Sequence, residues 1–215
     1  MVLPVSEKKA HWEKVYNSKS PLEVSWYQTR PTLSMRLIRH TQIAHDEPVI
    51  DVGGGASTLV DHLLDTGFSN ISVLDISASA LTQARKRLGD RSAEVNWYNE
   101  DIVGFNPPNR FTLWHDRAVF HFLTNQDERD KYVDVLKRSV KADGHVIMMT
   151  FALGGPQKCS GLDIVQYDAD KLMTELGPGF ELCESGHEVH VTPAGSEQQF
   201  AWFRLTRTAD AKKNR

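Results

Sequence analysis

The sequence predicts an α/β fold built on a doubly wound, mostly parallel sheet. Short apolar runs of strand length alternate along the chain with longer amphipathic segments of helical period. The run from His145 to Phe151 is apolar nearly throughout, as expected for a strand that helices cover on both faces. Two late runs joined by a short turn with Pro and Gly predict an antiparallel hairpin at one edge of this sheet.

The stretch from Pro48 to Asp75 is the most informative part of the pattern. An apolar run, Val49 to Val52, meets three consecutive glycines at positions 53 to 55, and the amphipathic segment from Leu59 to Thr66 follows. A second apolar run then ends at Asp75. Such a unit of strand, glycine turn, helix and strand binds a nucleoside, because the turn lets a ligand approach the backbone and the acid accepts ribose hydroxyls.

The segment before the first strand is predicted to supply helices and aromatic side chains. Residues 1 to 9 are expected to form a loose arm, after which Trp12 and Tyr16 recur at helical spacing. Trp26 lies in a connector that contains prolines. Because Tyr16 and Trp26 precede any strand against which they could pack, we interpret them as part of a lid that excludes water from the ligand.

The rest of the chain continues without a linker or an internal repeat, so we expect one domain. In it, residues 1–47 supply the helices and the lid, 48–207 the core and 208–215 a polar tail. The further helices are predicted at Thr32–His40, Ala78–Leu88, Asp127–Lys141 and Ala169–Leu176. The further strands are predicted at Val95–Asn99, Phe111–His115, His145–Phe151, Phe180–Val191 and Gln198–Arg207.

Composition narrows the function class. The formal net charge of −3 gives no basic footprint, which makes nucleic acid an unlikely partner. No apolar run approaches the ~18 residues of a membrane span, so we expect no membrane segment. The two cysteines, Cys159 and Cys183, have no metal-type spacing, and they are expected to be reduced thiols in a cytoplasmic protein. His187 and His190 would face opposite sides of a strand, and we predict no metal.

The glycine turn discriminates between nucleoside cofactors. A dinucleotide fingerprint requires a third glycine three residues beyond Gly55, where this chain has Thr58. With the spacing D-x-G-x-G-x-G, in contrast, Asp51, Gly53 and Gly55 match, and Ser57 takes the last position. The chain thereby resembles motif I of the class I S-adenosylmethionine (SAM)-dependent methyltransferases. The order of the later motifs and the terminal hairpin extend this resemblance over residues 49 to 207.

The resemblance implies a Rossmann-like sheet of seven strands that binds SAM and releases S-adenosylhomocysteine (SAH). Asp75 would accept the ribose hydroxyls, and Asp101 would accept the adenine amino group between the flanking side chains of Ile76 and Ile102. Asp51 would orient the turn and meet the ammonium of the methionine portion. The full set of expected cofactor-binding residues is Tyr16, Trp26, Asp51, Gly53, Gly54, Gly55, Ser57, Asp75, Ile76, Asp101, Ile102 and His115.

The methyl acceptor is left open by the sequence. The end of the fourth strand places His115, Asp116 and Arg117 near the reacting centre. His115 could be a general base oriented by Asp116 or a contact to the cofactor, and Arg117 could bind an anionic acceptor or form an internal salt bridge. The stretch 116–124 is similar to thiopurine and thiol methyltransferases, whereas the aromatic opening around Trp12 resembles small protein-lysine methyltransferases.

These two resemblances imply different acceptors. We favour a small molecule with a thiol, amine or hydroxyl group, because no additional domain for a macromolecule is visible in the sequence. A protein lysine and a non-catalytic SAM-binding module are the alternatives, and the protein is expected to be a monomer or a homodimer. The segment 152–167 is expected to be a long irregular loop that shapes the acceptor pocket. In it, Cys159 is either an inert thiol or, beside Lys158, a thiol of lowered pKa.

Overall fold

The computed structural model describes residues 5 to 208. Its helices are α1 (Val5–Ser18), α2 (Thr32–Thr41), α3 (Leu59–Asp65), α4 (Ala78–Leu88), α5 (Gln126–Ser139) and α6 (Ala169–Leu176). The 3₁₀ turns are η1 (Pro21–Glu23), η2 (Gly89–Glu94), η3 (Ile102–Gly104) and η4 (Phe120–Phe122). The strands are β1 (Val49–Val52), β2 (Ile71–Leu74), β3 (Val95–Tyr98), β4 (Phe111–Arg117), β5 (Val140–Phe151), β6 (Lys158–Cys159), β7 (Leu162–Asp163), β8 (Phe180–Val191) and β9 (Glu197–Arg207).

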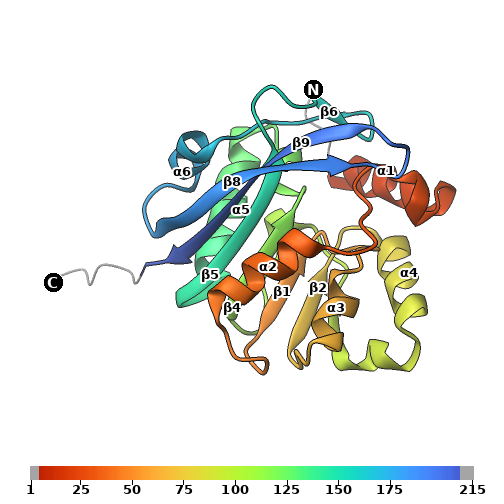
Figure 1. Cartoon of the computed structure of the whole chain (residues 1–215), viewed down its shortest axis with the longest axis horizontal. Helices are drawn as coiled ribbons and strands as arrows, with labels where there is room; N and C mark the ends of the chain where they lie inside the picture. The colour runs from red at the N-terminus through yellow and green to blue at the C-terminus, as the bar shows by residue number, and fades with distance from the viewer. Residues whose placement is uncertain (1–4, 209–215) are drawn as a thin grey trace, which may run out of the picture.

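The main sheet has seven strands in the order β3-β2-β1-β4-β5-β9-β8 (Figure 1). The strands β1 to β5 pair in parallel, whereas β9 pairs antiparallel with both β5 and β8. The predicted doubly wound sheet with a carboxyl-terminal antiparallel hairpin is therefore confirmed. Because strands β2 and β3 are added on one side of β1 and β4 and β5 on the other, the strand order reverses between β1 and β4. A crevice opens there beyond the carboxyl ends of these two strands, where ligands bind in such sheets.

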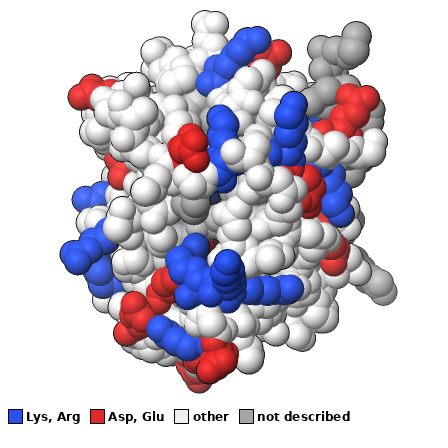
Figure 2. All heavy atoms as spheres, turned by 90° about the vertical axis from the view of Figure 1, so that its right-hand side faces the viewer, with Lys and Arg blue, Asp and Glu red and all other residues white. Residues whose placement is uncertain are grey.

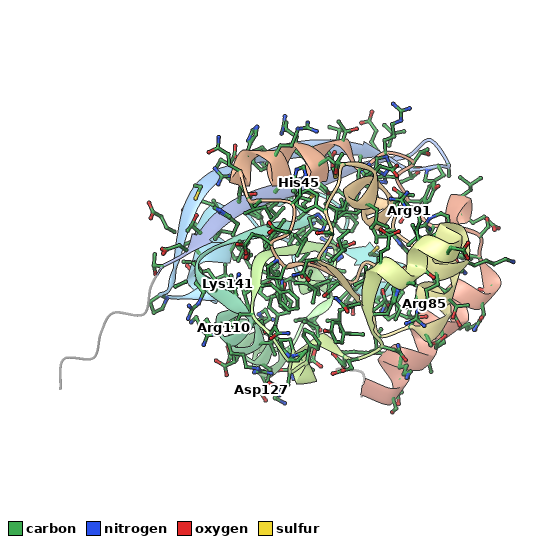
Figure 3. All side chains as sticks on the ribbon, turned by 90° about the horizontal axis from the view of Figure 1, so that it is seen from below. His45, Arg85, Arg91, Arg110, Asp127 and Lys141 are labelled. Atoms are coloured by element: carbon green, nitrogen blue, oxygen red, sulfur yellow. The ribbon has the colours of Figure 1, made fainter. Side chains whose placement is uncertain are left out.

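Alternate residues of the central strands face two separate apolar layers. Ile50, Trp114 and Met148 pack with α5 and α6 on one side, and Val49, Leu113 and Ile147 pack with α2 and α3 on the other. Burial on both faces explains why these strands read as continuous apolar runs. Seen from below (Figure 3), the labelled residues His45, Arg110 and Lys141 mark the amino ends of β1, β4 and β5, the side away from the glycine turn.

The structure differs from the predicted elements in three places. Helix α1 begins at Val5, so residues 5 to 9 are helical rather than a loose arm, while residues 1 to 4 lie outside the described chain. Helix α5 ends at Ser139, because Val140 takes an extended conformation and pairs with Phe111 at the start of β5. The segment after β5 is not wholly irregular, since β6 and β7 form a short antiparallel pair within it.

Within the described residues, no helix is long and apolar enough to cross a membrane.

Candidate functional site

Hydrogen bonds among the side chains of Asp51, His115 and Ser34 hold the strand end that leads into the glycine turn. The Nδ1 atom of His115 lies 2.7 Å from a carboxylate oxygen of Asp51 on the neighbouring strand, and its Nε2 atom lies 3.0 Å from the hydroxyl oxygen of Ser34 on α2. His115 is 2% exposed and Asp51 is 3% exposed. Because both ring nitrogens are engaged, His115 holds Asp51 in place and has no free lone pair with which to take a proton from an acceptor.

The three glycines of the turn are each required by their surroundings. Gly53 and Gly55 have positive φ angles of 66° and 38°, which side chains rarely adopt. A Cβ atom on Gly55 would lie 2.6 Å from a carboxylate oxygen of Asp75, and one on Gly54 would lie 2.6 Å from a carboxylate oxygen of Asp51. One on Gly53 would overlap the Val119 side chain. The turn therefore keeps the space above the ends of β1 and β2 open.

Asp75 follows β2 directly and is 7% exposed. One of its carboxylate oxygens accepts a hydrogen bond from the backbone N–H of Ser77 at 2.8 Å. Burial raises the pKa of Asp75 to about 7, against the opposing effect of the hydrogen bond from Ser77. The other oxygen lies beside Gly55, and Asp75 as a whole lines the first of the two cavities described below.

Asp101 comes after β3, where the chain turns into η3. Its first carboxylate oxygen accepts a hydrogen bond from the backbone N–H of Val103 at 3.1 Å. Its second oxygen is buried and has no hydrogen-bond partner among the described residues. A buried carboxylate oxygen without a donor is costly, and a ligand that brings an N–H or O–H donor removes that cost. Ile76 and Ile102 line the same cavity.

Two adjoining cavities lie beyond the carboxyl ends of the central strands. The first is lined by Asp75, Asp101 and the two isoleucines, and the second by Asp51, Gly54, Ser57 and His115. The residues that line both are Tyr16, Trp26, Gly53 and Arg117. Eleven of the twelve expected cofactor-binding residues thus line one cavity or the other, and Gly55 supports the wall behind Asp75.

The aromatic residues before β1 cover the site from the N-terminal side. Trp12, Tyr16 and Trp26 contact one another, with ring centroids 5.6 to 6.4 Å apart. Helix α1 is attached to the start of α4, because the carboxylate of Glu13 accepts hydrogen bonds from the backbone N–H groups of Ala78 (2.6 Å) and Ser79 (3.2 Å). Glu13 thus satisfies two amide groups at the start of α4 that have no partner within that helix.

Arg117 is the last residue of β4 and lies on the same face of the strand as His115. Its Nη1 atom donates a 2.8 Å hydrogen bond to the backbone oxygen of Trp26, and its guanidinium lies 4.8 Å from the centre of the Phe200 ring. Its Nε and Nη2 atoms are buried without a hydrogen-bond partner among the described residues. Burial lowers the pKa of Arg117 to about 10, so the group is still a cation at neutral pH.

Asp116 does not belong to the site, contrary to its predicted catalytic role. Its side chain points to the opposite face of the sheet, where it accepts hydrogen bonds from the hydroxyl of Tyr132 (2.5 Å) and the backbone N–H of Val119 (2.9 Å). It is fully buried and lines neither cavity. The physical reason is strand alternation, which sends adjacent side chains of β4 apart. Asp116 therefore cannot orient His115.

The two cysteines differ in their surroundings. Cys159 lines the first cavity and is 5% exposed, and burial raises the pKa of its thiol to about 11. The alternative of a low-pKa thiol beside Lys158 is wrong, because the removal of the thiol from water outweighs nearby positive charge. Cys183 lies on the edge strand β8 and is an exposed free thiol.

Two residues of this site carry no signal in the sequence. Ser34 is a helical residue whose polar contact to His115 lies 81 positions away along the chain. Glu13 is one acid among several in a charged helix, and its partners in α4 lie more than 60 positions on. Only the folded arrangement brings these groups to their partners.

The face that carries α1 and α4 shows a band of basic side chains (Figure 2). Three arginines of α4 and η2 on this side already have partners. Arg87 pairs with Asp61, Arg91 pairs with Asp65, and Arg85 lies over the ring of Trp97. Two of these three arginines are therefore neutralised by neighbouring acids. Among the described residues, no group of three or more His, Cys, Asp or Glu could hold a metal ion.

Comparisons with known proteins agree with this geometry. A family model described as a methyltransferase domain matches residues 50 to 146. The chain is 26% identical over 166 residues to the eEF1A lysine and N-terminal methyltransferase of Bos taurus, which covers 75% of this chain but only 23% of that protein. It is 23% identical over 191 residues to the human EEF1A lysine methyltransferase 2, which covers 82% of this chain and 75% of that protein.

Solved structures share the fold over nearly the whole chain. A SAM-dependent methyltransferase from Anabaena variabilis superposes with a TM-score of 0.75 at 16% identity and covers 96% of both chains. The N-methyltransferase NodS from Bradyrhizobium japonicum, solved with SAH, has a TM-score of 0.65 at 15% identity and covers 95% of this chain and 97% of that one. In its motifs, its fold and these matches, the chain is similar to the class I SAM-dependent methyltransferases.

Proposed function

We propose that this protein transfers a methyl group from SAM to a small nucleophilic acceptor. The observation that carries the proposal is the convergence of the expected cofactor-binding residues on two adjoining cavities. They come from the ends of three neighbouring strands and from the N-terminal lid, which is the arrangement that a ligand with an adenosine half and an amino-acid half requires.

The residues present fit SAM. Asp75 offers a carboxylate oxygen to the ribose hydroxyls, and the partnerless oxygen of Asp101 suits the adenine amino group. Ile76 and Ile102 offer apolar side chains to the adenine ring. In the second cavity, Asp51 presents negative charge next to the glycine turn, where the ammonium of the methionine portion belongs. Bound SAM supplies a methyl group on a positively charged sulfur atom.

His115 is proposed to be a positioning residue rather than a general base. It supports Asp51 through one ring nitrogen and is held by Ser34 through the other. His121, the other histidine close to β4, is fully buried, and burial together with the Arg117 cation lowers its pKa to about 3. The thiol of Cys159 is protonated at neutral pH. We therefore propose that methyl transfer relies on positioning and on exclusion of water by the lid, without a protein base among these groups.

The small acceptor is supported by three aromatic side chains that line the first cavity, in which Trp12 contacts both Trp26 and Phe122. The second candidate is a protein lysine. It is favoured by the relatives, whose names describe lysine methylation of eEF1A. A non-catalytic SAM-binding module remains the rival from another class. A cytoplasmic location, a monomer or homodimer, and a single domain over residues 1 to 215 are further parts of this proposal.

Incubation of the protein with methyl-labelled SAM and cell extract tests the proposal. The extract is separated into small molecules and proteins, and a matched reaction contains the Asp75→Ala variant. We expect label in the small-molecule fraction with the wild-type protein and at least about tenfold less with the variant, which loses the ribose acceptor. Label in protein alone would select the lysine candidate, and SAH binding without transfer to either fraction would select the non-catalytic module.

A further inference from the structure

Arg117 is a buried cation whose hydrogen-bonding capacity is only partly used. One of its three nitrogens donates to the Trp26 backbone, while Nε and Nη2 have no partner among the described residues. Glu188 on β8 attracts the guanidinium electrostatically, but within the described residues one Glu188 oxygen and two Arg117 nitrogens are each buried without a hydrogen-bond partner. Buried guanidinium N–H groups without acceptors are costly, which indicates that a ligand supplies the acceptor.

The position of Arg117 relates it to the transferable methyl group. Arg117 is one of the four residues that line both the first cavity, which holds Asp75 and Asp101, and the second cavity, next to the glycine turn. The sulfur of SAM joins the adenosine and methionine halves, so the shared wall is where the methyl group belongs. The guanidinium of Arg117 lies over the ring of Phe200 on β9. It also interacts electrostatically with Cys159 on β6 and Glu188 on β8. Of these three residues, Cys159 lines the first cavity together with Arg117.

Two positive charges would therefore lie close together at the wall that the two cavities share. The guanidinium cation and the sulfonium repel each other at low dielectric, and the carboxylates of Glu188 and Asp51, which attract Arg117, form no hydrogen bond with its Nε and Nη2 atoms. A protonated lysine side chain would add a third positive charge at the same place. An anion, in contrast, is attracted by both cations and can accept the N–H groups that Arg117 leaves unused.

From this arrangement, and resting on the proposed function, we infer that the methyl acceptor is a small anion. Its charged group, a thiolate or a carboxylate, is held by Nε and Nη2 of Arg117 beside the aromatic side chains of Trp12, Trp26 and Phe122. The planar fork of arginine suits a carboxylate through two parallel hydrogen bonds, and it suits a thiolate as a cationic partner. Because the anion is formed before it binds, the site needs no base.

The bond changes are balanced without a proton transfer. The anionic acceptor uses one of its lone pairs to form the bond to the methyl carbon. The electron pair of the broken carbon–sulfur bond stays on the sulfur, which becomes a neutral thioether, and the methylated acceptor is neutral as well. A neutral thiol or hydroxyl would have to lose a proton, and among His115, His121 and Cys159 no group is poised to take it. A neutral amine could attack directly, but its product would carry a positive charge beside Arg117.

Calorimetry on the full chain saturated with SAH tests the inference with three probes of similar shape: benzoate, thiophenolate and neutral aniline. We expect both anions to bind more tightly than aniline. Arg117→Gln should weaken anion binding by about 10- to 100-fold, the usual range for hydrogen bonds to a charged group, and Arg117→Lys should restore part of it. The affinity for SAH itself should change by less than about threefold. Arg36→Gln is the matched control, because Arg36 lies over the Trp202 ring but lines neither cavity.

The outcomes of this experiment separate a failure of the anion inference from a failure of the proposed function. If the anions bind no better than aniline, or if Arg117→Gln leaves anion binding unchanged in a folded protein, the inference is wrong. If Arg117→Gln weakens SAH binding as much as anion binding, Arg117 holds the carboxylate of the cofactor instead, and the proposed function still stands. If the wild-type protein does not bind SAH, the proposed function fails and takes the inference with it. Methyl-labelled SAM in place of SAH then shows which anion accepts the label.

Discussion

The pKa of Asp75 should make cofactor binding depend on pH. Burial raises this pKa to about 7, and only the ionised carboxylate can accept both ribose hydroxyls. With a pKa near 7, about 90% of the molecules carry the ionised form at pH 8 and about 10% at pH 6. If SAH binds only to the ionised form, its apparent dissociation constant rises about tenfold as the pH falls from 8 to 6. Calorimetric titration with SAH at several pH values measures this directly.

The Asp75→Asn variant separates this effect from other titrations. An amide offers one acceptor oxygen instead of two, so we expect SAH to bind at least about tenfold more weakly than to the wild type at pH 8. The pH dependence between 6 and 8 should disappear in the variant. Asp46→Asn is the control, because Asp46 is exposed and precedes β1 at the opposite end of the sheet. A wild-type affinity that is constant between pH 6 and 8, or a variant with wild-type affinity at pH 8, would refute the role of Asp75.

Three further predictions concern the lid, the support of the turn and the thiols. Glu13→Ala should lower the free energy of detaching α1 from α4 by about 1 kcal/mol, because α4 loses hydrogen bonds at its start. Trypsin should then cleave α1 about fivefold faster than in the control Glu7→Ala, whose side chain is exposed. Equal cleavage of the two variants would argue against this role of Glu13. His115→Phe should lower the free energy of unfolding in urea by about 3 to 5 kcal/mol, because Asp51 is left buried without its partner; a loss below about 1 kcal/mol would contradict this. A disulfide reagent at pH 8 should modify Cys183 at least about 100-fold faster than Cys159, whose pKa is about 11; similar rates would show that Cys159 is accessible.

The fold was predictable wherever local pattern and tertiary packing agree. Helix α4 begins after Ser77, whose hydroxyl caps it by accepting from the Ala80 N–H, and both bounds of the helix match the prediction. The end of α5 was misplaced because Val140 continues the apolar helical period while its backbone already pairs with Phe111. Such a boundary depends on a partner strand that lies 29 positions earlier, which periodicity within the helix cannot reveal.

The cofactor side of the site was predictable because its residues follow strands. In a parallel sheet the carboxyl ends of the strands meet at one edge, so Asp51, Asp75 and Asp101 come together for reasons visible in the sequence. The acceptor side was less predictable. The partners of His115 and Asp116, Ser34 and Tyr132, lie on helices far from them in sequence. The sequence could show that the two side chains point apart, but not that both are already occupied.

A pair of calorimetric titrations tests the central claim most directly, one with SAH and one with NAD⁺, each added to the full chain. A SAM site predicts one SAH bound per chain and no heat of binding from NAD⁺. The reason is that the turn has Thr58 at the position where a dinucleotide fingerprint requires a glycine. Binding of NAD⁺ without binding of SAH would contradict the assignment of both cavities.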